Sequence, residues 1–124
     1  MGYKPHKILE AWKRAVDITT IIYKITDNFP KTEIYGLTSQ VRRAGVSIAS
    51  NIAEGAARQT KKEFVQFLHC AQGSLSELDT QLTIANKLGY ISDDEFKIIE
   101  QELDLEDSML TVLIKPIIIK MKGK

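Results

Sequence analysis

The chain has 124 residues, of which 44% are hydrophobic and 27% are charged, and its formal net charge is +1. This size and balance predict one globular domain over residues 1–124 with a core of its own. A lone cysteine, Cys70, excludes a disulfide within the chain, and with no secretion leader in view it predicts a cytoplasmic protein. No apolar run is long enough to span a bilayer, so no membrane contact is expected.

The first helix is predicted over residues 5–28, with Pro5 in its first turn and Asn28-Phe29-Pro30 at its end. Its apolar positions recur every three or four residues, as an amphipathic helix requires: Ile8, Trp12, Ala15, Thr19, Ile22 and Ile25. The second helix is predicted over residues 32–57, with Thr32 as its N-cap and Glu33 in its first turn.

Small residues fill the second helix between the members of its apolar stripe. The stripe consists of Leu37, Val41, Ala44, Ile48 and Ile52. The small residues around it are Gly45, Ser47, Ala49, Ser50, Ala53, Gly55 and Ala56. Such a surface lets a neighbouring helix come very close, so this helix is expected to form an interface, either within the fold or between subunits.

The third helix is predicted over residues 60–88, because Thr60 and Glu63 form a capping box at its start and Gly89 stops it. Its apolar positions alternate spacings of four and three, which makes an unbroken heptad seam: Phe64, Leu68, Ala71, Leu75, Leu78, Leu82 and Ala85.

The fourth helix is predicted over residues 92–119, with a second capping box at Ser92 and Glu95 and a kink or frayed turn at Pro116. Its stripe is interrupted once, at Glu106, and consists of Phe96, Ile99, Leu103, Leu110, Leu113 and Ile117. Four amphipathic helices joined by short turns predict an all-α fold, an antiparallel up-down-up-down four-helix bundle.

Apolar residues also lie off the main stripe of the fourth helix, namely Ile98, Leu105, Met109 and Val112. A bundle helix needs one apolar stripe, so this surplus predicts a contact between copies of the chain. The alternative is that a wide stripe belongs to a well-buried helix.

Charge is divided unevenly along the chain. Residues 1–62 carry 11 basic and 5 acidic side chains, whereas residues 63–124 carry 6 basic and 11 acidic ones. The two halves can neutralise each other by packing together, or they can present opposite signs to different partners. A basic cluster around the second helix and the turn after it could track phosphates: Arg42, Arg43, Arg58, Lys61 and Lys62. No aromatic residues interleave with it, so binding would depend on shape and charge.

The sequence offers no catalytic constellation. Neither His6 nor His69 follows a glutamate by three positions, which excludes the Glu-x-x-His pairs of di-iron bundles. His69 and Cys70 are adjacent, and their side chains would point about 100° apart on a helix. Glu54, near Arg58, is best explained as an ion-paired structural residue. The chain also lacks a phosphate-binding glycine loop and a nucleophile elbow, so no enzyme activity, cofactor or metal is expected.

Several runs of the sequence together resemble the four-helix-bundle proteins encoded within intervening sequences of bacterial 23S rRNA genes. These runs are Trp12 with Ala15, Pro30-x-x-Glu33-x-Tyr35-Gly36-Leu37-x-x-Gln40-x-Arg42-Arg43-Ala44, Ser47-Ile48-x-x-Asn51-Ile52-Ala53-Glu54-Gly55, Phe64-x-x-Phe67-Leu68 and Gly73-Ser74-x-x-Glu77-Leu78-x-x-Gln81-Leu82. The resemblance implies a ring-like homopentamer. It extends to the accessory variability proteins of diversity-generating retroelements, which bind nucleic acid and a reverse transcriptase.

Two functions follow as hypotheses. The first is a non-enzymatic, self-assembling bundle that associates with structured RNA or DNA through Arg42, Arg43, Arg58, Lys61 and Lys62. The alternative is a protein–protein interaction scaffold without nucleic-acid binding, in which the same residues form salt bridges between subunits to the acids of residues 93–107.

Overall fold

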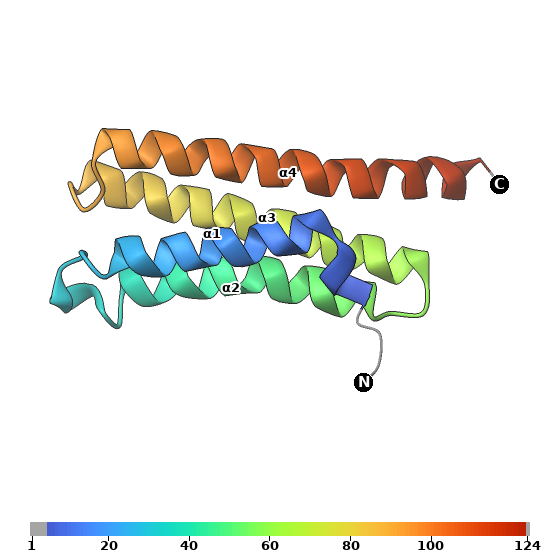
Figure 1. Ribbon diagram of the computed structural model, residues 1–124, viewed down its shortest axis with the longest axis horizontal. Helices are drawn as coiled ribbons and strands as arrows, with labels where there is room; N and C mark the ends of the chain where they lie inside the picture. Colours follow the sequence, from blue (N-terminus) through green and yellow to red (C-terminus); the bar gives the residue numbers. More distant parts are fainter. Residues whose placement is uncertain (1–4, 124) are drawn as a thin grey trace.

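The computed structural model describes residues 5–123, except for the side chains of Lys7 and Ile8. Four antiparallel α-helices make up the bundle (Figure 1): α1 (Glu10–Thr26), α2 (Leu37–Ala56), α3 (Lys61–Lys87) and α4 (Asp93–Lys122). The turns after α1 and α3 lie at one end, the turn after α2 lies at the other, and the last turns of α4 project beyond it. The described residues form no strand, and the predicted all-α four-helix bundle is confirmed.

The first two helices begin later than the sequence predicts. A short 3-10 helix, η1 (Pro5–Ile8), comes first, and Leu9 is extended, so α1 starts at Glu10 rather than at Pro5. A second 3-10 helix, η2 (Lys31–Glu33), occupies the predicted start of the second helix, so Thr32 is not its N-cap. The Glu33 carboxylate instead accepts a hydrogen bond from the Leu37 amide at 3.1 Å, which satisfies one of the free N–H groups at the start of α2.

The starts of α3 and α4 and the end of α3 follow their sequence signals. The Thr60 hydroxyl accepts from the Glu63 amide at 3.2 Å, and the Ser92–Glu95 capping box is reciprocal. Gly89 adopts a φ of 80°, the left-handed conformation that glycine tolerates best. Helix α4 continues through Pro116 to Lys122, so the predicted end at residue 119 is three residues short.

The α3 seam forms the centre of the core. All its predicted positions after Phe64 are buried, whereas Phe64 itself is partly exposed. On α4 the stripe drifts slightly from the predicted face, because Ile114 is buried and Leu113 lies at its margin. The buried members of both helices face those of α1 and α2, which include Ile18, Ile22, Ile48 and Ile52.

The small residues of α2 allow close contacts within the fold. The Thr19 hydroxyl of α1 donates to the Gly45 carbonyl at 3.0 Å, and Ser47 shares a hydrogen bond of 2.8 Å with Ser74 of α3. Gly55 lies directly against α3, where an added Cβ would be 2.6 Å from the Cβ of Phe67. At these positions the expected close interface is therefore between helices of one chain.

We expect Gly55→Ala to lower the free energy of unfolding by about 1–3 kcal/mol, because the new methyl group overpacks the contact with Phe67. The matched control is Gly73→Ala on α3, where an added Cβ has no atom within 4 Å. That change should stabilise the protein by about 0.5–1 kcal/mol through helix propensity alone. Urea denaturation measures both, and a stabilising Gly55→Ala would contradict the close packing.

Glu106 interrupts the α4 stripe and is nevertheless fully buried. Both of its carboxylate oxygens are shielded from solvent and lack a hydrogen-bond partner among the described residues. Burial raises the pKa of Glu106 to about 7, although the nearby Arg14 guanidinium opposes this shift. Arg14 itself donates to Glu102 on the same helix as Glu106.

Candidate nucleic-acid interface

Three of the predicted basic residues gather at the turn between α2 and α3. Arg58 follows the end of α2, and its guanidinium lies over the ring of Phe67 at 4.8 Å. Its Nη2 is 3.9 Å from a carboxylate oxygen of Glu54, a long and solvent-exposed ion pair. Lys61 and Lys62 are exposed in the first turn of α3, and no ion pair joins either of them to an acid within residues 5–123.

The local structure places these two lysines at the N-terminus of α3. Thr60 caps α3, so Lys61 and Lys62 are its first two helical residues. A helix N-terminus carries a partial positive charge, which disfavours lysine there and favours an anion. The lysines therefore gain nothing from the helix they begin, and an anion bound beside them would interact favourably with both the side chains and the backbone N–H groups.

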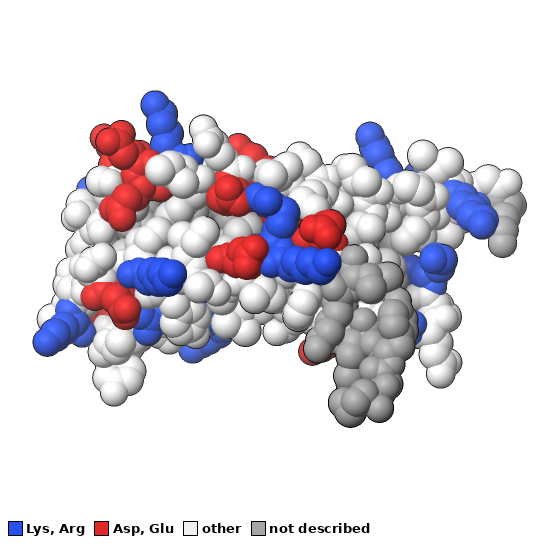
Figure 2. All heavy atoms as spheres, in the orientation of Figure 1, with Lys and Arg blue, Asp and Glu red and all other residues white. Residues whose placement is uncertain are grey.

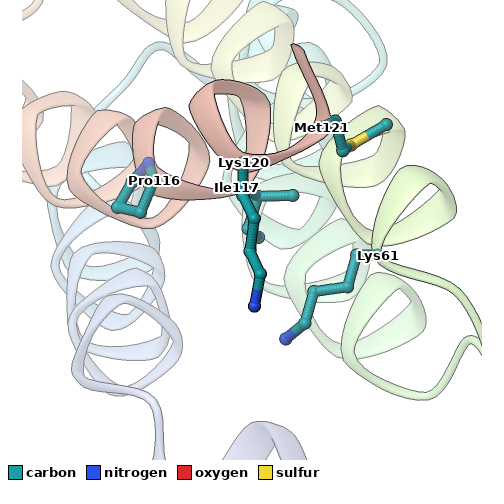
Figure 3. Close-up of a pocket in the computed structure, with 5 residues that line it drawn as sticks. All are labelled: Lys61, Pro116, Ile117, Lys120 and Met121. Atoms are coloured by element: carbon teal, nitrogen blue, oxygen red, sulfur yellow. The ribbon is translucent and has the colours of Figure 1, made fainter. Parts of the chain in front are cut away.

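The end of α4 lies beside this turn and adds a further cation. A groove of about 430 Å³ runs between the two elements, and Lys61, Pro116, Ile117, Lys120 and Met121 line it. The side chains of Lys61 and Lys120 reach into the same space (Figure 3). Sequence reasoning missed Lys120, because only the antiparallel fold brings residues so far apart together. The sequence does place Lys120 near the end of the fourth helix, and in an antiparallel bundle that end lies next to the α2–α3 turn.

Arg42 and Arg43 lie elsewhere. The Arg42 guanidinium donates to the Thr26 hydroxyl at 2.8 Å and to the Asp27 carboxylate at 3.0 Å, and it lies over the ring of Tyr23. Arg42 thus joins the end of α1 to α2. Arg43 is exposed, and its Nη2 is 3.4 Å from the Ser39 hydroxyl.

The five predicted residues therefore form two groups. Arg42 and Arg58 are separated by 16 positions, about 24 Å along a helix. On the face in Figure 2, lysine and arginine gather without acidic neighbours at the end where α4 projects, whereas both signs are mixed at the other end. At the turn between α2 and α3, Lys61 and Lys62 are exposed without an ion pair among the described residues, and Arg58 lies beside them in its long pair with Glu54.

Residues 5–123 were also searched for a metal site, a His–Cys pair and a membrane span. No group of three or more His, Cys, Asp or Glu side chains in this range is arranged to hold a metal ion. His69 and Cys70 are both exposed on α3. None of the described helices combines the length and apolar character that a membrane span requires.

Comparison with known proteins identifies relatives of the chain. A family model described as 23S rRNA-intervening sequence protein matches residues 7–112. A crystal structure from Bacteroides thetaiotaomicron, of a protein with unknown function from the S23 ribosomal protein family, is similar with a TM-score of 0.76. It is 22% identical, and the match covers 85% of this chain and 98% of that one, which supports the fold. No curated protein matches. The family match shows that the chain belongs to the 23S rRNA-intervening sequence protein family.

Proposed function

We propose that this member of the 23S rRNA-intervening sequence protein family is a non-enzymatic, self-assembling bundle that binds structured RNA or DNA. The observation that carries the proposal is the exposed group of Arg58, Lys61 and Lys62 beside the N-terminus of α3. Exposed cations at a helix end suit phosphate oxygens at fixed spacing. No base-reading motif accompanies them, so the complex would recognise shape and charge rather than sequence.

Self-assembly strengthens this proposal. Three cations on one subunit give weak binding, whereas a symmetric assembly repeats the same group and multiplies its effect. The resemblance to the family implies five subunits. Arg42 is a poorer candidate for phosphate contact, because its guanidinium already binds Thr26 and Asp27 within the subunit. We assign Arg43 a secondary role at most, since it lies on α2 away from the turn.

The alternative is a protein–protein scaffold without nucleic-acid binding. One observation favours it: the acidic residues at the start of α4, Asp93, Asp94 and Glu95, are exposed and could face cations of another subunit. The two functions differ in their response to nucleic acid, so a single set of binding measurements separates them.

We expect the triple variant Arg58→Gln, Lys61→Gln and Lys62→Gln to bind RNA and DNA more weakly, and to the same extent for every sequence. The slope of log K against log salt should fall by about one for each phosphate that the variant no longer neutralises. Thr60 and Glu63 are unchanged, so the cap of α3 and the fold should persist. Fluorescence anisotropy with a labelled duplex and a labelled structured RNA, at several salt concentrations, measures the effect.

The matched control replaces Lys24, Lys31 and Lys97 by glutamine, three exposed lysines outside the turn. It removes the same formal charge, so it should change binding only slightly if the position of the cations matters. Equal weakening in both variants would point to net charge alone. Absence of binding by the unmodified protein at low salt would refute the nucleic-acid proposal and leave the scaffold.

A further inference from the structure

The groove that Lys61 and Lys120 share combines two kinds of surface. The two side chains come from α3 and α4 and converge on the same space (Figure 3). Neither lysine forms an ion pair with an acid among residues 5–123. The rest of the lining is apolar and consists of Pro116, Ile117 and Met121. The groove therefore offers two cations beside a hydrophobic floor.

Much of this floor is not used by the core of the bundle. Ile117 is partly buried and packs against the core, whereas Pro116 and Met121 lie outside it, and Met121 is 45% exposed. The last turns of α4 project beyond the other helices, so no other described helix covers them (Figure 1). The volume of about 430 Å³ lies in the range of small-ligand sites, roughly 300–1,000 Å³. The groove suits a ligand with an apolar face and negative charge.

The surrounding charge narrows the choice of ligand. Arg58 and Lys62 belong to the same turn as Lys61. The two acids of this turn, Glu54 and Glu63, are already engaged with Arg58 and with Thr60. A polyanion suits such a region better than a neutral ligand or a single acid. A nucleic-acid strand carries a phosphate on either side of every base, so it can supply both charges and an apolar face in one unit.

A fully paired duplex cannot use both surfaces. It presents phosphates and sugars to a helix end and keeps its bases stacked inside, so the floor of the groove would stay uncovered. A nucleotide that is unpaired, in a bulge or a loop, can turn its base outward. The faces of such a base pack on apolar as well as aromatic side chains.

We propose that the groove holds one unpaired nucleotide of a structured nucleic acid. Its base lies on Pro116, Ile117 and Met121, and its flanking phosphates lie against Lys61 and Lys120. This inference rests on the proposed function and makes it more specific, because a helix with a bulge or a loop is preferred over a continuous duplex. The two ammonium groups are the polar groups of the lining side chains, so the groove favours an unpaired base without reading its identity.

Three labelled blunt-ended duplexes, made as RNA and as DNA, test the proposal on the unmodified protein. One is fully paired, one carries a single bulged adenosine, and one carries the same bulge without its base. Fluorescence anisotropy should give a dissociation constant about fivefold lower for the adenosine bulge than for the other two, the size of a weak stacking contact. Equal binding with and without the base would overturn the proposal and leave the proposed function standing. Absence of binding by all three at low salt would refute both.

The variant Ile117→Asn with Met121→Gln tests whether the base lies in this groove. Both lysines remain, so the fivefold preference should disappear while the salt dependence of binding to the paired duplex is unchanged. The control, Val112→Gln with Ile119→Asn, makes the same kinds of change at exposed positions of α4 outside the groove and should keep the preference. Met121→Gln alone alters one exposed side chain and should reduce the preference even if the double variant unfolds. A preference that both groove variants retain, or that the control also loses, would overturn the assignment.

Lys120→Gln tests the phosphate contact. The slope of log K against log salt should fall by about one for the duplex with the adenosine bulge. The matched control is Lys115→Gln, which removes an exposed lysine of α4 that does not line the groove and should leave the slope unchanged. Equal slopes for the two variants would contradict a phosphate at Lys120.

Discussion

Leu78→Ala is expected to lower the free energy of unfolding by about 2–5 kcal/mol. Leu78 is fully buried at the middle of the α3 seam, and residues of the other helices complete the same core cluster. Replacing its isobutyl group by a methyl group deletes buried apolar surface and leaves a cavity that four packed helices cannot close without moving together. Equilibrium denaturation in urea, followed by circular dichroism, gives the midpoint and the free energy.

The comparison that makes this result informative is Thr60→Ala. That change removes one capping hydrogen bond at an exposed helix end and should cost about 1 kcal/mol. Leu75→Ala, one turn before Leu78 on the same seam, should behave like Leu78→Ala because it is also buried. A larger loss of stability for Thr60→Ala than for both leucine variants would contradict the assignment of these leucines to the buried face of α3.

The sequence predicts the four helices well where signals at both ends agree with the apolar period. Helix α3 has a cap, a heptad seam and a stop glycine, and its bounds lie within a residue of the prediction. Helix α2 starts five residues late, because Glu33 caps it from an adjoining 3-10 turn and not through a Ser or Thr at the usual position. Thr32 followed by Glu33 looks like an N-cap with an acidic first turn, and this signal set the predicted start at residue 32, whereas the apolar stripe begins at Leu37, where α2 starts.

The candidate site shows a different limit. Proximity along the sequence grouped Arg42 with Arg58, yet α2 separates them and Arg42 is engaged with Asp27. Lys120, far along the chain, lines the groove beside Lys61. The grouping of charged side chains on the surface depends on which helix ends lie next to each other. It can therefore be predicted only after the topology is known. The interruption at Glu106 was visible in the sequence, but its burial depends on α4 keeping one face inward across a charged residue.

The buried carboxyl of Glu106 should make stability fall as pH rises. The pKa of Glu106 in the folded protein is about 7, above its ordinary value of 4.5, so the folded state binds more protons than the unfolded state between these values. Stability is therefore greatest below about pH 4.5 as far as this group is concerned, decreases through pH 7, and is constant above it. The ionised, buried carboxylate costs about 3 kcal/mol at pH 8.

Glu106→Leu removes this cost with a side chain of similar volume that suits the surrounding core. We expect the variant to be more stable than the unmodified protein by about 3 kcal/mol at pH 8 and by much less at pH 4.5. Arg14 keeps its hydrogen bond to Glu102, so no new unpaired cation results. Urea denaturation of both proteins from pH 4.5 to pH 8 gives the difference at each pH.

A matched variant isolates Glu106 from the second carboxyl that titrates in the same range. A hydrogen bond with Asp79 and burial raise the pKa of Glu100 to about 7 as well, so Glu100 contributes to the same decrease. Glu100→Gln should remove only that share and leave the difference made by Glu106→Leu unchanged, because the two groups face different neighbours, Asp79 and Arg14. A stability gain from Glu106→Leu that is equal at pH 4.5 and pH 8 would show that packing, and not the buried charge, is responsible.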